Sequence, residues 1–309
     1  MRRLATFPLL LLLAGCTTQK LNAVQASLVD LRAQPHTEAQ SGAHDPLEET
    51  QLLYGERVRV LKSEDGWSYV EAPEQQEFTH AHRWQGYPGW IPTATLSPSA
   101  SIAPNLVVIQ PWAETWQDPY LQRATSHRFA LGTMLVGIDM GGQLWKIELL
   151  DGSTVWMRHE DAQSLETLAF LNPLDRRRMV ISRAETFLGQ PYYWGGRSPQ
   201  GIDCSGLTNV AYRASGVGIP RDAHEQYLRA TRINALQPGD LIFLSEKDNP
   251  ARIVHVMLYA GNGEVIEAPG TGSTVRRIAI AERLGHPMDW IAPGVVVEGQ
   301  TVSFGSYLP

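Results

Sequence analysis

The chain has no excess of basic residues and only one close pair of histidines. It carries 26 lysines and arginines against 32 aspartates and glutamates, a formal net charge of −6 over 309 residues. No cationic surplus is available to neutralise phosphates, which argues against nucleic acid as the main partner. His80-Ala81-His82 is the only close histidine pair, and no carboxylate–histidine cluster accompanies it. The sequence therefore predicts neither a metal site nor a cofactor.

Long apolar runs are also missing, apart from a short one in residues 9–13 that follows Arg2 and Arg3. This run is too short to span a bilayer as a mature helix. Leu13-Ala14-Gly15-Cys16 comes next and resembles the bacterial lipoprotein signal, in which the cysteine becomes the lipidated N-terminus after cleavage. The resemblance implies a signal peptide at 1–16 and an exported protein anchored to a membrane through Cys16. A residue such as Thr17 after the lipidated cysteine indicates sorting to the outer membrane, on its periplasmic face. The alternative is an ordinary signal peptide that happens to end near a cysteine.

Cysteine is scarce, since Cys16 and Cys204 are the only two. If Cys16 is acylated, the exported protein has one thiol and no intramolecular disulfide. A single thiol in an oxidising compartment is either buried and inert or reactive, so the residues around Cys204 must decide.

Glycine (27) and proline (20) are plentiful, a composition that favours short strands and turns. Residues 17–45 are polar and predict a tether. After them, one pattern occurs twice: a glycine, a strand, a turn, and two tryptophan-led strands. Gly55 lies 12 residues before Trp67, and Gly132 lies 13 residues before Trp145. Two small all-β barrels, at 46–100 and 101–171, fit this pattern and resemble bacterial SH3-like modules. The alternative is two spacers whose tryptophans fill small cores.

Residues 172–309 have a different pattern. Apolar residues from 179 to 188 have helical spacing, and Gly189 and Pro191 end the run. Strand patterns follow at 240–244, 255–259, 265–268 and 275–280. A helix followed by antiparallel strands predicts an α+β domain.

Cys204 is predicted to open a helix. Leu207, Val210 and Ala211 behind it form one apolar face, which places Cys204 in the first turn. Free backbone N–H groups and the positive end of the helix dipole stabilise a thiolate there. The alternative is a small apolar residue capping a core helix, but polar Asp203 flanks the cysteine.

His255 is the candidate base for this thiol. Two apolar strands flank Gly261-Asn262-Gly263, which is a strong hairpin signal. If the loop is centred on Gly261, His255 faces Glu267 directly, with their Cβ atoms about 5 Å apart. Such a carboxylate fixes the tautomer of the imidazole and stabilises the imidazolium. The alternative is an edge-strand histidine beside a solvated glutamate.

Several motifs in the C-terminal region occur in the order of a known family. These are residues 189–196 (GQPYYWGG), 203–207 (DCSGL), 220–223 (PRDA), 239–243 (GDLIF) and His255-Val256. Over roughly residues 173–295 the chain resembles the NlpC-type peptidases, papain-like enzymes that hydrolyse bonds in bacterial wall peptides. With two SH3-like modules in front, it is most similar to the dipeptidyl-peptidase VI branch.

The resemblance implies roles for individual residues. Cys204 and His255 match the nucleophile and the base, and Tyr192 matches a tyrosine that helps to hold the oxyanion. Asp203 and Ser205 match positions that receive the terminal ammonium of the substrate.

The resemblance also implies that the first module supplies Tyr87 and Glu49 to the cleft; barrel packing and solvated surface are their alternatives. The family usually has histidine at the position of Glu267. Arg221 and Asp222 match a motif that ion pairing explains as well as ligand binding does.

The predicted function follows from these roles. A papain-like cysteine peptidase, preceded by two SH3-like barrels, would cut the γ-D-glutamyl–diamino acid bond of peptidoglycan peptides that have a free N-terminal L-alanine. Two alternatives stay open: a catalytically impaired cell-wall-binding lipoprotein, and an endopeptidase that acts on intact cross-linked wall.

Overall fold

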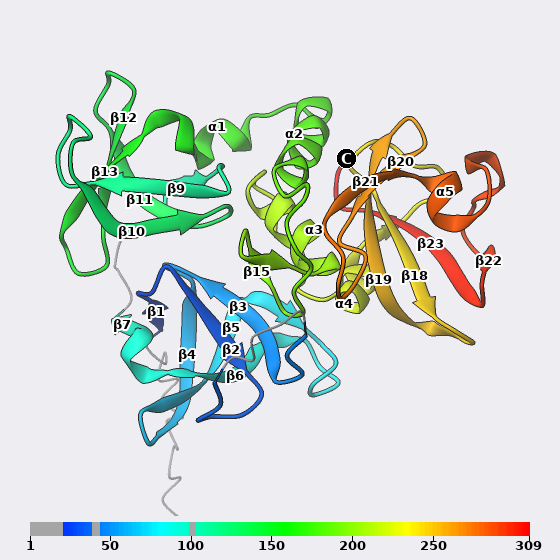
Figure 1. Ribbon diagram of the computed structural model, residues 1–309, viewed down its shortest axis with the longest axis horizontal. Coiled ribbons are helices and arrows are strands. Elements are labelled where there is room, and N and C mark those ends of the chain that lie inside the picture. The colour runs from blue at the N-terminus through cyan, green and yellow to red at the C-terminus, as the bar shows by residue number, and fades with distance from the viewer. Residues whose placement is uncertain (1–20, 39–43, 99–102) are drawn as a thin grey trace, which may run out of the picture.

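The computed structural model of the protein describes residues 21–38, 44–98 and 103–309 (Figure 1). Cys16 lies outside the described residues, so its lipidation stays a prediction. Three seven-stranded sheets and one two-stranded sheet organise the described part of the chain. No helix in that part is long and apolar enough to cross a membrane.

The first sheet has the strand order β3-β2-β6-β5-β4-β1-β7. Its elements are β1 (Asn22–Val24), β2 (Leu28–Arg32), β3 (Glu48–Leu53), β4 (Arg57–Glu64), β5 (Trp67–Glu77), β6 (Gln85–Pro92), the 3-10 helix η1 (Thr93–Thr95) and β7 (Leu96–Pro98).

The second sheet has the order β10-β9-β13-β12-β11-β8-β14, which is the first order with every strand number raised by seven. Its elements are β8 (Leu106–Val108), β9 (Trp112–Trp116), β10 (Ala124–Ala130), β11 (Met134–Asp139), β12 (Leu144–Glu148), β13 (Thr154–Arg158), the 3-10 helix η2 (His159–Asp161) and β14 (Ala162–Ser164). The internal repeat predicted from the sequence is thus confirmed at the level of strand order.

The glycines that marked the repeat have a backbone role. Gly55 and Gly132 precede β4 and β11 and have φ angles of 78° and 87°. Positive φ is accessible to glycine without the steric cost that a Cβ adds. The turn before β4 and the turn before β11 therefore both favour glycine at the same position of the repeat.

Neither sheet is a closed barrel by its strand pairings. Among the described residues, no pairing joins β3 to β7 or β10 to β14. The N-terminal half is sheet-rich, as predicted, but the two SH3-like barrels are not confirmed.

The predicted tether at 17–45 is wrong for the segment that forms β1 and β2. Both strands belong to the first sheet: β1 pairs with β4 and β7, and β2 pairs with β3 and β6. Val24, Val29 and Leu31 are buried there. The polar composition of the segment hid a short alternation of buried and partly exposed residues, which is the pattern of a half-buried strand.

Tryptophans fill the small cores less than the spacer alternative assumed. Of the seven in the two sheets and their connections, only Trp90 and Trp145 are buried. The cores consist mainly of aliphatic side chains.

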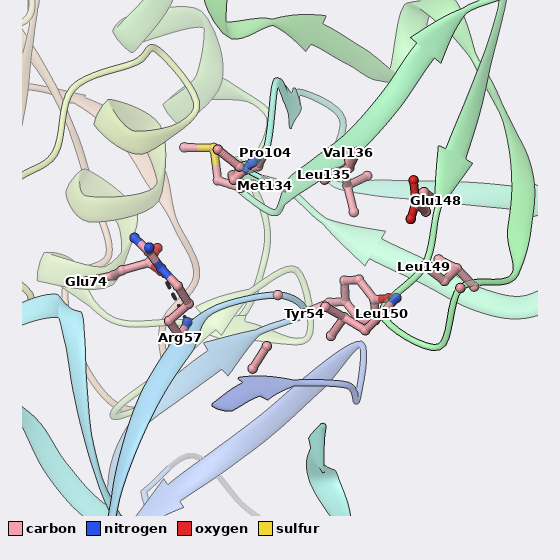
Figure 2. A pocket seen from close by; sticks show the side chains of 14 residues that line it. Tyr54, Arg57, Glu74, Pro104, Met134, Leu135, Val136, Glu148, Leu149 and Leu150 are labelled. Atoms are coloured by element: carbon pink, nitrogen blue, oxygen red, sulfur yellow. Dashed lines mark hydrogen bonds and ion pairs between the residues drawn. The ribbon is translucent and has the colours of Figure 1, made fainter. Parts of the chain in front are cut away.

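A cavity of about 350 Å³ lies between the first two sheets (Figure 2). An Arg57–Glu74 ion pair of 3.2 Å lines it, together with Tyr54. The Tyr54 ring packs against Phe129 of the second sheet, and its hydroxyl oxygen accepts a hydrogen bond of 2.7 Å from the Leu150 amide. The cavity belongs to the junction of the two sheets, and no residue predicted for the active site lines it.

The rest of the chain combines helices with the third seven-stranded sheet, which confirms the α+β prediction. The helices are α1 (Leu165–Ala169), α2 (Pro173–Glu185), α3 (Cys204–Arg213), α4 (Ala223–Arg229), α5 (Ile280–Leu284) and η3 (Met288–Trp290). The strands are β15 (Arg197–Ser198), β16 (Gly201–Ile202), β17 (Thr231–Arg232), β18 (Leu241–Glu246), β19 (Asn249–Gly261), β20 (Glu264–Glu267), β21 (Arg276–Ala279), β22 (Val296–Val297) and β23 (Gln300–Ser306).

The third sheet is buried on both faces. In β18, Leu241 and Phe243 pack into the core that contains α2 and α3, whereas Ile242 and Leu244 pack into a second core with α5. Successive side chains of a strand point to opposite faces, so a continuous apolar run suits a strand between two layers. In Figure 1, α2 and α3 lie between the second sheet and this third sheet.

Candidate active site

The nucleophile candidate begins a helix, as predicted. Cys204 is the first residue of α3, and the preceding Asp203 caps the helix by accepting a hydrogen bond of 2.6 Å from the Gly206 amide. The Cys204 thiol is free and 8% exposed. A Cβ on Gly206 would stand 2.2 Å from the carbonyl oxygen of Gly196, so this turn requires glycine. The thiol therefore lies at the positive end of a rigidly packed helix.

The imidazole of His255 lies between Cys204 and Glu267. It hydrogen-bonds the thiol of Cys204, and its Nε2 lies 2.8 Å from Glu267 Oε2. Burial lowers the pKa of His255, but Cys204 and Glu267 outweigh burial and raise it to about 9. This arrangement favours an imidazolium at neutral pH and is the nucleophile–base–orienter geometry of covalent catalysis.

The hairpin that joins His255 to Glu267 has a different register from the predicted one. Leu258 pairs with Ile266 and Tyr259 with Val265, so paired residue numbers add to 524 and not to the predicted 522. His255 therefore does not lie directly opposite Glu267. The shift is two residues, which keeps both side chains on one face of the sheet, and the diagonal contact replaces the direct one.

Glu267 is fully buried and has three cationic or protonated partners. Besides His255, it accepts hydrogen bonds from Arg276 and Arg283, with shortest distances of 2.7 and 2.9 Å. Burial raises the pKa of Glu267, but His255 and the arginines outweigh burial and lower it to about 2. Sequence reasoning missed both arginines. Their only signal was charge on a strand and a helix close in sequence to Glu267.

Tyr192 lies beside the nucleophile. Its backbone forms a parallel bridge with Ile202, two residues before Cys204. Burial, followed by the charges of Asp203 and Cys204, raises the pKa of the Tyr192 phenol. The hydroxyl therefore stays protonated and can act as a hydrogen-bond donor close to the thiol, as an oxyanion requires.

Asp203 and Ser205 are linked to a buried arginine. Arg221 is 0% exposed and donates to both Asp203 oxygens, at 3.1 and 2.7 Å, and to Ser205 Oγ at 2.9 Å. Asp203 also accepts from the Ser205 hydroxyl at 3.1 Å. From the sequence, ion pairing and ligand binding explained Arg221 equally well, and in the structure Arg221 forms an ion pair with Asp203.

The first sheet supplies the other two predicted residues. The Tyr87 ring is buried in the first sheet, and its hydroxyl donates to Asp222 at 2.9 Å and to Glu49 at 3.4 Å. His80 Nε2 lies 3.4 Å from Glu49 Oε2. Because Asp222 also lies 3.5 Å from Arg221, a chain of polar contacts runs from the Asp203 cap to Glu49. Every predicted site residue except Cys16 thus joins one of two connected clusters around α3.

Comparison with known proteins agrees with this geometry. Residues 189–288 match the NlpC/P60 family. Three relatives resemble most of the chain. The gamma-D-glutamyl-L-lysine dipeptidyl-peptidase of Bacillus cereus is 29% identical over 75% of this chain and 70% of its own length, and that of Bacillus subtilis is 28% identical over 78% of each. Dipeptidyl-peptidase 6 of Lysinibacillus sphaericus is 28% identical over 77% of this chain and 85% of its own.

A solved structure shows the same fold. The crystal structure of an NlpC/P60 family protein from Bacillus cereus superimposes with a TM-score of 0.75, covering 94% of this chain and 100% of the other at 24% identity. The likeness spans the two N-terminal sheets as well as the region around Cys204.

Proposed function

Because the chain carries an NlpC/P60 domain and is a cysteine-type peptidase, we propose that it hydrolyses the γ-D-glutamyl–diamino acid bond of peptidoglycan stem peptides. The observation that carries the proposal is the hydrogen-bonded series Cys204–His255–Glu267 at the start of a helix. Relatives named for cleavage at γ-D-glutamyl-L-lysine support the choice of bond.

The proposed mechanism proceeds through an acyl-enzyme. The Cys204 sulfur attacks the γ-carbonyl carbon, and the Cys204 amide and the Tyr192 hydroxyl stabilise the oxyanion. As the C–N bond breaks, the His255 imidazolium gives its proton to the leaving amine. Neutral His255 then removes a proton from water, whose oxygen attacks the thioester. The products are a free γ-carboxylate and the regenerated thiol.

The charges beside α3 support a preference for a free amino terminus. Glu49, Asp203 and Asp222 are three carboxylates linked by Arg221 and Tyr87. Arg221 offsets one of them, and His80, whose pKa Glu49 raises to about 9, offsets another. Burial raises the pKa of Asp222 to about 7, and a bound ammonium group would favour its ionised form. Since Asp203 caps the helix that begins with Cys204, an ammonium bound here would lie a fixed distance from the scissile bond.

The remaining features belong to the same proposal. We assign the two N-terminal sheets, at about 46–100 and 101–171 with the first extended back to β1, as SH3-like modules, because they share one strand order. The peptidase domain would take 172–309. Acylation of Cys16 would hold the protein at the periplasmic face of the outer membrane, near its substrate.

Defined wall peptides test the proposal. The purified protein should cleave L-Ala-γ-D-Glu-diamino acid peptides and should act poorly on the same peptides with an acetylated alanine. Cleavage of intact cross-linked wall at an equal rate would favour the endopeptidase alternative. No cleavage of either, with retained binding to wall, would favour the impaired wall-binding lipoprotein.

A further inference from the structure

The Glu267 carboxylate, which contacts His255, accepts hydrogen bonds from two arginines. Arg276 donates to Glu267 Oε1 through Nε at 3.1 Å and through its terminal nitrogen at 2.7 Å. Arg283 Nε donates to both oxygens, at 2.9 and 3.0 Å. Glu267 is 0% exposed, so the carboxylate itself is shielded from solvent, although the Arg276 side chain is partly exposed.

Separate elements supply the two arginines. Arg276 lies directly opposite Glu267 in the β20–β21 pair, which fixes it by strand register. Arg283 comes from α5, which packs into the second core of the third sheet. Two independently anchored guanidinium groups therefore converge on one carboxylate, Arg276 through two nitrogens and Arg283 through Nε.

We infer that Arg276 and Arg283 are positioning residues, which fix the Glu267 carboxylate so that Oε2 holds the His255 ring toward Cys204. This inference rests on the proposed peptidase function and deepens it. Planar guanidinium forks bind carboxylates with a defined orientation, unlike the point charge of lysine. Both arginines hold Oε1, and Oε2, which also accepts from Arg283 Nε, is the oxygen that faces His255 Nε2.

The arginines also set the charge balance around the imidazole. The charged and titratable groups here are Cys204 of α3, His255 of β19, Glu267 of β20, Arg276 of β21 and Arg283 of α5. A buried carboxylate without cationic partners would be costly and would tend to take up a proton. Two neighbouring cations keep it ionised, and they limit how strongly His255 holds its own proton.

Two variants and one control test the inference in the full-length protein. Arg283→Gln removes the Nε donor shared by both carboxylate oxygens together with its charge. Arg276→Gln removes the two-nitrogen contact and its charge at a side chain that is 44% exposed, where a substitution is easily tolerated by the fold. Arg277→Gln is the matched control: it lies on the same strand but pairs with Glu264 and Glu185. Arg283→Lys restores the charge without the planar guanidinium whose Nε contacts both carboxylate oxygens.

The readout is alkylation of Cys204, which needs no substrate. The rate with anionic iodoacetate is divided by the rate with neutral iodoacetamide at each pH. This ratio falls where His255 loses its proton, near pH 9 in the parent. Removing a cation raises the pKa of a nearby group, so the midpoint should move up by about 0.5 to 1 pH unit in Arg283→Gln.

Arg276→Gln should show a smaller shift in the same direction, because solvent screens its partly exposed charge. Arg283→Lys should return the midpoint toward the parent, yet turnover should stay about tenfold low because the oriented Nε contact with both carboxylate oxygens is missing. Arg277→Gln should match the parent in both measurements.

The inference is overturned if Arg283→Gln and Arg276→Gln keep the midpoint and turnover of the parent, or if they lose only thermal stability. A parent ratio with no fall across the pH range would mean that no thiolate–imidazolium pair exists. That result would overturn the proposed function itself, and the two failures are thus distinguishable.

Discussion

Replacing Glu267 by glutamine tests the chemistry of the site most directly. The glutamate uses both oxygens as acceptors, Oε1 for Arg276 and Arg283 and Oε2 for His255 and Arg283. Glutamine has one acceptor oxygen and one amide nitrogen that only donates. Whichever way the amide turns, its nitrogen faces a donor, either the imidazolium or a guanidinium. The substitution therefore removes a charge and also creates a buried mismatch.

The expected loss follows from these two effects. In a serine triad, losing the orienting carboxylate costs about four powers of ten in turnover. The raised pKa of His255 means that its imidazolium is partly preformed, which reduces the cost, whereas the mismatch with the arginines adds to it. We expect kcat to fall about 100- to 1000-fold in Glu267→Gln, equivalent to about 3 to 4 kcal/mol.

The pH profile shows whether charge is responsible. In the parent, the alkaline limb of kcat should lie near pH 9, where His255 loses its proton. Without the carboxylate, the imidazolium is less stable, so the pKa of His255 falls and the limb should move down by about one pH unit. The measurement is kcat for an L-Ala-γ-D-Glu-diamino acid peptide, for parent, Glu267→Gln and Glu267→Ala. A Glu267→Ala enzyme with the rate and pH profile of the parent would refute the reasoning.

Three shorter predictions concern other parts of the molecule. Cys204→Ala should abolish hydrolysis and leave the thermal unfolding transition in place, because alanine fits the first turn of α3; retained turnover would contradict the role of Cys204. Tyr87→Phe keeps the buried ring but removes the hydroxyl that donates to Asp222 and Glu49, so KM for peptides with a free alanine should rise about tenfold while KM for N-acetylated peptides stays unchanged. Cys16→Ser should move the protein from the membrane fraction to the soluble fraction after cell fractionation, and a variant that stays membrane-bound would disprove anchoring through Cys16.

Local signals predicted the elements that carry the peptidase chemistry. The helix that starts at Cys204 and the hairpin around Gly261 could both be predicted from the sequence, because apolar spacing and turn residues are short-range features. The exact register of the hairpin was not, since Gly261 pairs with Glu264 at an irregular position. The contact between His255 and Glu267 survived this error only because a two-residue shift preserves the face.

The sequence could not predict which residues from other elements contact the site residues. Arg276 and Arg283 reach Glu267 only after the third sheet and α5 have packed, and nothing in their spacing specifies a carboxylate partner. The strands β1 and β2 were missed for a related reason. Each is only three to five residues long and depends on pairing with strands that follow much later in the sequence.

This chain has Glu267 where the related peptidases usually have histidine, and the two arginine partners of Glu267 explain the difference. The resemblance to enzymes with histidine here implied that Glu267→His would keep appreciable activity. The structure changes that expectation, because an imidazole facing Arg276 and Arg283 cannot take over both ion pairs of the carboxylate. Glu267 therefore depends on Arg276 and Arg283, and replacing it alone would leave both arginines without their carboxylate partner.

Buried charges also join the first sheet to the catalytic region. Arg197, which is 1% exposed, forms an ion pair of 2.9 Å with the equally buried Glu56 of the first sheet and also binds the Gln51 carbonyl. Arg221 donates to the Thr50 hydroxyl as well as to Asp203. Separating the two parts would take Glu56 from Arg197 and leave that arginine with the neutral Asn209, and breaking a buried pair costs about 3 to 5 kcal/mol. Buried polar contacts therefore hold the first sheet against the region around α3, unlike a spacer, and residues 172–309 expressed alone should be unstable.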